Sequence, residues 1–118
     1  MDAWKKEELA AAGINVEDAL GRFMGNEMLL NRFLKKFLDD TNYGKLSQAM
    51  EAKDMEGAIA ASHTLKGVSG NLSMTRLHEL LTSQVAALRA GDWEAASALM
   101  PEISQAYDAV VAAIQRSA

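Results

Sequence analysis

One segment of the chain, Ser62 to Leu72, combines residue types that could do chemistry at phosphorus. It carries His63, then Lys66 three residues later, and then Gly67 and Gly70. A neutral imidazole exposed to solvent can attack phosphorus through a ring nitrogen. A lysine one turn away can neutralise the charge on transferred phosphoryl oxygens. The spacing therefore raises the hypothesis of a phosphoryl-accepting site.

On a helix with about 100° per residue, this segment has two distinct faces. A small and aliphatic face is expected to pack against the core; it comprises Ala58, Ala61, Leu65, Val68, Ser69 and Leu72. His63 lies about 160° from Leu65 and is expected to point outward. Gly67 and Gly70 fall on either side of His63, and Lys66 lies about 60° from it.

The two glycines are unfavourable for a helix, because each costs up to about 1 kcal/mol relative to alanine. We interpret Gly67 and Gly70 as a close-approach surface, where another molecule can come near the backbone beside His63. Two simpler interpretations stay open. A lone histidine on a helix surface is commonly a solvated polar residue, and helix glycines can serve packing between helices. Geometry alone therefore leaves the function open.

The elements that position this segment are predicted to be helices. The chain has 118 residues, with 21 alanines, seven aromatic residues and one proline. Alanine is the best helix former, whereas strands favour β-branched and aromatic residues. Asn-Gly and Asp-Gly, the strongest hairpin signals, do not occur in the sequence. We expect an all-α protein with a single domain over residues 1–118.

Helix ends are marked by glycines and by capping residues. Two short N-terminal helices are predicted, one over residues 3–12 that Gly13 ends, and one that Asn15 caps. Asp18 stands three residues after Asn15, in a capping-box-like arrangement. Four further caps are predicted before the longer helices: Asn26, Asp54, Thr75 and Asp92.

Four longer helices are predicted over about residues 26–51, 54–72, 75–90 and 92–116. We expect the first to be one continuous helix with a bend near Gly44. Pro101 should kink or locally break the last one, because proline removes a backbone donor and clashes with the preceding turn. Short connections make neighbouring helices antiparallel, so the expected architecture is an up-down-up-down four-helix bundle.

Composition and charge exclude several classes of protein. Apolar residues make up 49% and charged residues 24%, which argues against disorder and against a membrane span. The chain has no cysteine, which excludes a disulfide scaffold and thiolate metal sites. Its net charge of −4 provides no basic surface for nucleic acid. The first residues lack the apolar stretch of a signal peptide, so we expect a cytoplasmic protein.

The run His63-Thr64-Leu65-Lys66-Gly67, with Val68 to Leu72 after it, resembles the signature of histidine-containing phosphotransfer (HPt) domains. These domains are intermediate carriers of bacterial and plant multistep phosphorelays. The resemblance covers roughly residues 13–115 and includes Gly13 to Leu20 and the capped run from Asn26 to Phe37. One position departs from the family, since Ser73 stands where a glycine is usual.

The resemblance implies that His63 is the phosphorylated residue, that Lys66 supports the phosphoryl group and that Gly67 leaves room for the partner. The implied partners are response-regulator receiver domains, together with a hybrid sensor histidine kinase as a further candidate. The receiver would bring its own Mg²⁺, and the chain itself would need neither metal nor cofactor. We expect a monomeric phosphoryl carrier without an ATP-binding or kinase domain.

Neighbouring residues supply further hypotheses about the site. Gln84 interrupts an apolar stripe at the height of His63 and needs a hydrogen-bond partner. It could orient the His63 ring, or it could bond a nearby backbone carbonyl. Ile59 and Met74 could form an apolar docking surface, although core packing is the alternative, and His78 is expected to be solvated. The methionines are expected in the core, together with Phe23, Phe33 and Phe37.

Three other functions compete with the carrier hypothesis. A non-catalytic helical adaptor that binds receiver or kinase domains is the main alternative, although the motif looks intact. A self-phosphorylating kinase fragment is disfavoured, since the chain contains no glycine-rich phosphate loop. A metal- or haem-binding bundle needs several inward ligands, whereas the chain has two histidines. A free-standing protein and a piece cut from a larger hybrid kinase would carry the same sequence.

Overall fold

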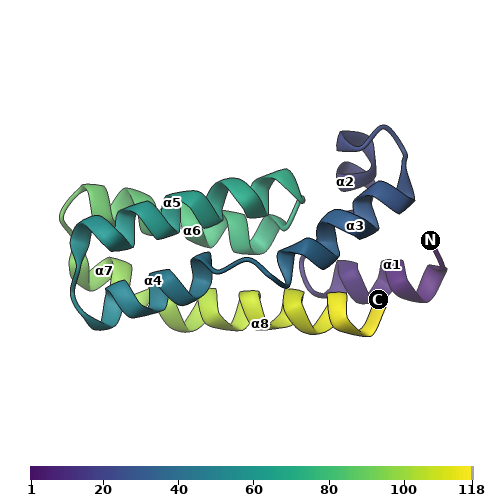
Figure 1. Cartoon of the computed structure of the whole chain (residues 1–118). Helices are drawn as coiled ribbons and strands as arrows, with labels where there is room; N and C mark the ends of the chain where they lie inside the picture. Colours follow the sequence, from purple (N-terminus) through teal and green to yellow (C-terminus); the bar gives the residue numbers. More distant parts are fainter. Residues whose placement is uncertain (118) are drawn as a thin grey trace.

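The computed structural model describes residues 1–117, and its architecture is helical. Eight helices follow one another: α1 (Ala3–Ala11), α2 (Val16–Arg22), α3 (Glu27–Phe37), α4 (Asn42–Glu51), α5 (Met55–Asn71), α6 (Thr75–Arg89), α7 (Trp93–Ala98) and α8 (Met100–Ser117). Figure 1 shows an elongated molecule, in which α4 to α7 form one end and α1 to α3 the other, while α8 runs beneath both. Its extents are 43 × 23 × 20 Å. The predicted all-α class is confirmed.

The antiparallel bundle is held together by buried aliphatic side chains. Four tightly connected segments alternate in direction: α3 with α4, then α5, then α6, and finally α7 with α8 (Figure 1). Each fully buried valine, leucine or isoleucine contributes about 1.5–3 kcal/mol relative to an exposed one. The fully buried members include Leu30, Leu46, Leu65, Leu77, Leu81, Leu88, Ile103, Val110 and Ile114.

The continuous helix predicted over residues 26–51 is wrong. The chain forms two helices instead, because α3 ends at Phe37 and α4 begins at Asn42. The side chain of Asp40 accepts hydrogen bonds from the backbone N–H and the amide nitrogen of Asn42, at 2.8 and 3.0 Å. Such local side-chain bonds compete with helical backbone bonds and open a turn. The break therefore lies at residues 38–41, whereas Gly44 sits inside α4.

The last predicted helix, 92–116, is interrupted once. It divides into α7 and α8 at Leu99. Pro101 is the second residue of α8. The N–H groups of the first turn make no intrahelical hydrogen bond, so a proline there costs the helix none. The local break expected from Pro101 is therefore confirmed, and it falls just before the proline.

Four of the predicted N-caps are confirmed. In each case a side-chain oxygen accepts a hydrogen bond from the backbone N–H three residues later; the caps are Asn15, Asn26, Asp54 and Asp92. The cap predicted at Thr75 is wrong. Met74 occupies that position without a side-chain cap bond, and the Thr75 hydroxyl donates to the Ser73 carbonyl oxygen at 3.3 Å.

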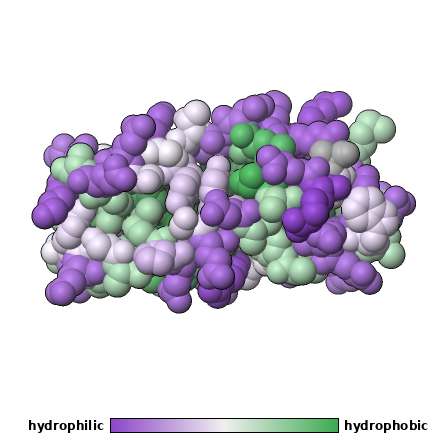
Figure 2. Space-filling view, turned by 90° about the horizontal axis from the view of Figure 1, so that it is seen from below, coloured by the Kyte–Doolittle hydropathy of each residue, from purple (hydrophilic) through white to green (hydrophobic). Residues whose placement is uncertain are grey.

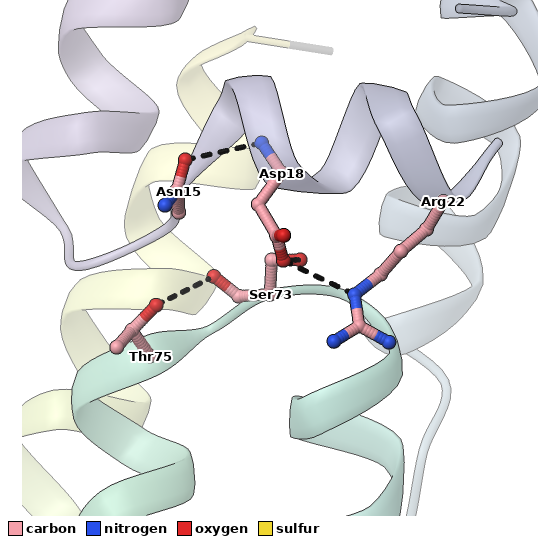
Figure 3. Close-up of polar contacts among 5 residues, drawn as sticks. All are labelled: Asn15, Asp18, Arg22, Ser73 and Thr75. Carbon is pink, nitrogen blue, oxygen red and sulfur yellow. Dashed lines mark hydrogen bonds and ion pairs between the residues drawn. The ribbon is translucent and has the colours of Figure 1, made fainter. Parts of the chain in front are cut away.

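Ser73 forms the turn between α5 and α6 with a backbone φ of +54°, a conformation that suits glycine better than serine. Its side chain makes a contact that glycine could not make, since the Ser73 hydroxyl donates to the Asp18 carboxylate at 2.6 Å. The Asn15 N–H donates to the Ser73 carbonyl oxygen at 2.8 Å. Figure 3 shows α2 lying across this turn, with Arg22 bonded to the same carboxylate. The serine thus attaches the N-terminal helices to the bundle.

Several side chains that were expected in the core are exposed. Met24 and Met28 are 95% and 75% exposed, and Phe33 is 40% exposed, whereas Phe37 is buried. Figure 2 views the side of the molecule that lies lowest in Figure 1 and shows hydrophobic patches separated by hydrophilic residues. Within residues 1–117, no helix is both long and apolar enough to cross a membrane.

The Asp18 contact predicts a pH-dependent contribution to stability. The hydrogen bond from Ser73, followed by that from Arg22, lowers the pKa of Asp18. A carboxyl whose pKa is lower in the folded chain stabilises the fold above its unfolded pKa, and this stability is lost as the pH falls through the folded pKa. We expect Asp18→Asn to lower Tm at pH 7, and we expect its difference from the wild type to shrink as the pH falls below the ordinary range of an aspartate toward the lowered pKa.

Thermal unfolding followed by circular dichroism between pH 3 and pH 7 measures this difference, with Glu17→Gln on the same turn as the control. An equal Tm at pH 7, or a difference that does not shrink toward pH 3, would contradict the assignment.

Candidate functional site

The imidazole of His63 lies on the outer surface of α5. His63 is exposed, while its neighbour Ser62 is completely buried and Leu65 packs in the core. The buried residues of α5 are Ala58, Ala61, Ser62, Leu65 and Ser69, so the helix packs with its small-residue face against the bundle. Because this face of α5 packs inward, the imidazole of His63 points away from the core, as the helical periodicity predicts.

Gly67 lies one turn after His63 and leaves the backbone bare. It is exposed, and a Cβ atom built on it would meet no atom within 4 Å apart from its chain neighbours and the adjacent backbone of α5 itself. An open groove of about 550 Å³ runs between α4 and the first part of α5, and Thr64, which follows His63 in the chain, is the last residue of α5 that lines it. Ala60 and Thr64 of α5 line it, as do Asn42 and Lys45 of α4. A second molecule could therefore reach the backbone next to the imidazole.

Lys66 provides a positive charge one turn after His63. Its side chain is partly buried at the edge of the same face. The ion pairs found within residues 1–117 join other groups and leave its ammonium available for an anion. An imidazole, an ammonium and an unobstructed backbone thus share one surface of α5.

Gly70 does not belong to the free surface, which corrects the prediction that it leaves room for a partner. The ring of His78, from α6, occupies the space beside it, and a Cβ on Gly70 would lie 2.9 Å from two ring atoms. The His78 Nδ1 atom lies 2.8 Å from the Lys66 carbonyl oxygen. His78 is therefore partly buried against α5 rather than fully solvated, and Gly70 serves packing between helices.

Gln84 does not orient the His63 ring, since both ends of its amide are engaged inside the bundle. Its Oε1 accepts from the Ser62 hydroxyl at 2.8 Å, and its Nε2 donates to the Ala96 carbonyl oxygen at 3.2 Å. Nε2 also lies 3.1 Å from the Met100 sulfur. The alternative, a bond to a backbone carbonyl, is correct. Gln84 acts on the residue before His63 and fixes Ser62 in the core.

The docking surface suggested for Ile59 and Met74 is wrong for Met74. Met74 is completely buried, and its backbone pairs with Ile14 in an isolated antiparallel bridge. Ile59 is partly buried and packs against the core cluster. The reversal at Ser73 turns Met74 inward, a direction that helical periodicity could not reveal.

Two residues of the site were missed, Ser62 as an anchor and His78 as a contact of Lys66. The sequence held a signal for Ser62, because a serine on the core-facing side of a helix needs a hydrogen-bond partner. It held no signal for His78, because helical periodicity does not show where α6 crosses α5. Among residues 1–117, no cluster of three or more histidine, cysteine, aspartate or glutamate side chains could hold a metal ion.

The comparison with family models places this arrangement in a known class. The model of the Hpt domain matches residues 29–113, which is most of the chain. The chain therefore belongs to the Hpt domain family, whose members take part in phosphorelays as histidine phosphotransfer modules and interact with receiver and kinase partners. Searches of curated proteins and of solved structures gave no significant match.

The two glycines of α5 should respond in opposite ways to substitution by alanine. Gly67→Ala adds a methyl group in open space and should stabilise the fold by about 0.5–1 kcal/mol through helix propensity. Gly70→Ala drives a methyl group into the His78 ring and should destabilise the fold despite the same gain in propensity. Urea unfolding of both variants measures the free energies. Equal shifts of the same sign would show that His78 does not fill the space beside Gly70.

Proposed function

We propose that this Hpt domain accepts a phosphoryl group on His63 from the phospho-aspartate of a receiver domain and passes it to another receiver. The observation that carries the proposal is the exposed imidazole of His63, with Lys66 one turn away and open backbone at Gly67. A carrier must accept and release the same group, which requires an accessible nucleophile rather than an enclosed pocket.

The proposed transfer exchanges one bond to phosphorus for another. An unprotonated ring nitrogen of His63 attacks phosphorus as the bond to the aspartyl oxygen breaks, and the carboxylate leaves with the bonding electron pair. The remaining ring proton stays on the other nitrogen or passes to water. Negative charge on the transferred oxygens is what the Lys66 ammonium would neutralise. Because the product bond is also reactive, the reverse attack by a second aspartate completes the relay.

The partner is proposed to complete the site. A receiver that approaches along α5 would meet the bare backbone of Gly67 and the groove beside Thr64. We propose that the Mg²⁺ for the transfer is bound by the receiver, and that this chain contributes the imidazole and the ammonium. Monomeric state and cytoplasmic location stay predictions.

A non-catalytic adaptor that binds receiver or kinase domains without transfer is the alternative. It would require a partner surface but no nucleophile. The placement of Lys66 beside His63 favours the carrier, because an adaptor gains nothing from a cation next to an exposed imidazole.

Removal of the imidazole should abolish phosphorylation. We expect wild-type protein, mixed with receiver domains charged by acetyl phosphate, to gain a label that is acid-labile and alkali-stable, as phosphohistidine is. His63→Gln should gain none, while its circular dichroism stays that of the wild type, since residue 63 is exposed. Persistent label in His63→Gln would assign the chemistry to another residue, and binding without label in the wild type would favour the adaptor.

A large side chain at residue 67 should block the partner but not the chemistry. We expect Gly67→Gln to slow transfer from a receiver by about ten-fold or more, because a displaced partner loses the aligned geometry of attack. Phosphorylation by phosphoramidate, a small donor that needs no docking, should continue at the wild-type rate. Gly67→Ala serves as the small matched control. Equal loss with both donors would mean that the substitution damages the imidazole site itself.

A further inference from the structure

His78 makes a polar contact with the backbone of the helix that carries His63. Its Nδ1 lies 2.8 Å from the carbonyl oxygen of Lys66. A carbonyl oxygen can only accept a hydrogen bond, so Nδ1 of His78 must carry the proton and donate it. The contact therefore fixes the tautomer of the neutral His78 ring and links α6 to the turn that follows His63.

The surrounding residues are shaped to admit the His78 ring. Any side chain at Gly70 would place its Cβ 2.9 Å from the Nδ1 and Cε1 atoms of the ring. The Lys66 carbonyl oxygen also accepts a hydrogen bond from the Ser69 hydroxyl at 3.0 Å, and Ser69 is completely buried. This turn of α5 thus contains a built site for the imidazole of His78.

The contact strengthens the weakest part of α5. Gly67 and Gly70 each cost up to about 1 kcal/mol of helix stability relative to alanine, and both follow Lys66 within four residues. On the other side of His63, the buried Ser62 is held by Gln84 of α6 at 2.8 Å. The turn that presents His63 is therefore fixed to α6 at both ends, by Gln84 before it and by His78 after it.

We propose that His78 is a positioning residue for phosphoryl transfer, which keeps the 66–70 turn helical and so holds the Lys66 ammonium beside His63. The inference rests on the proposed function and adds a residue to it. His78 does not touch the phosphoryl group; it acts through the backbone of Lys66. The glycine at 67 that admits a partner weakens the helix locally, and the His78 contact compensates for that weakness.

Phosphoramidate tests the proposal without a docking partner. We expect His78→Leu, which keeps bulk but loses the donor, to lower the rate of His63 phosphorylation about three- to ten-fold, the value of one hydrogen bond. His78→Asn places an amide N–H at the position of Nδ1 and should recover most of the rate. Thr82→Ala removes a hydroxyl that donates to the His78 carbonyl oxygen on the exposed side of α6, and should match the wild type.

A double-mutant cycle with Lys66→Gln shows whether His78 acts through Lys66. Once the ammonium is absent, His78→Leu should cause little further loss of rate, because coupled residues are not additive. Full additivity would overturn the inference, and so would an unchanged rate in His78→Leu or in Lys66→Gln. If His78→Leu unfolds, Gly70→Ala takes its place in the cycle, because a methyl group at residue 70 of α5 displaces the His78 ring of α6.

Nuclear magnetic resonance separates this inference from the proposed function. In wild-type protein at pH 8, ¹⁵N shifts of the His78 ring should report a protonated Nδ1 and a bare Nε2. Exchange of the Gly70 amide proton should be faster in His78→Leu, because that amide completes the 66–70 turn. The opposite tautomer, or unchanged exchange, overturns the inference alone. A wild-type protein that takes up no phosphoryl group overturns the proposed function and the inference with it.

Discussion

The rotation of α5 about its own axis is the constraint on which the site depends. A helix whose small residues lie on one face can approach two neighbours closely, and α5 packs between α4 and α6 on that face. Ala58 and Leu65 are completely buried there. Turning the helix by one residue would bury the imidazole and expose Leu65, at a cost of about 1.5–3 kcal/mol for that leucine alone. Apolar packing thus holds a polar group in water.

Buried polar contacts then fix the position of α5 along its neighbours, which apolar packing alone does not determine. Apolar burial has no direction of its own, so it sets the face of a helix but not the register between two helices. The buried amide of Gln84 adds direction, because its two ends bond Ser62 and the Ala96 carbonyl oxygen. The described residues include no buried side-chain nitrogen or oxygen atom without a hydrogen bond, so this network is complete. A complete network fixes one arrangement of α5 against α6 and α7.

Features that depend on neighbouring residues along the chain were predictable from the sequence. The caps at Asn15, Asn26, Asp54 and Asp92 join atoms three residues apart, and the outward direction of His63 follows from helical periodicity. Features that depend on another helix were not. A helical projection gives the angle of Gly70 about α5 but not the place where α6 crosses, and the partners of Gln84 lie on three other elements.

The break between α3 and α4 shows a different limit. Asp40 and Asn42 are polar residues that suit an exposed helical face as well as a turn, so their identity alone does not separate the two. The sequence predicts the bend at Gly44 instead, because glycine disfavours helix. Gly44 nevertheless lies inside α4. Likewise, Phe33 follows Leu30 by three residues and precedes Phe37 by four, which is the spacing of a core face, and yet it is 40% exposed.

The division of α5 into a packed side and a bare side has an evolutionary consequence. Residues such as Thr64 and Gly67 contribute little buried apolar area, so exchanging them disturbs no core packing and changes the free energy of folding mainly through helix propensity. Substitutions on the exposed face of α5 can therefore accumulate during evolution and change which molecule binds there. They require no compensating changes in the core. Only toward α6, where Gly70 accommodates an imidazole, is that freedom restricted.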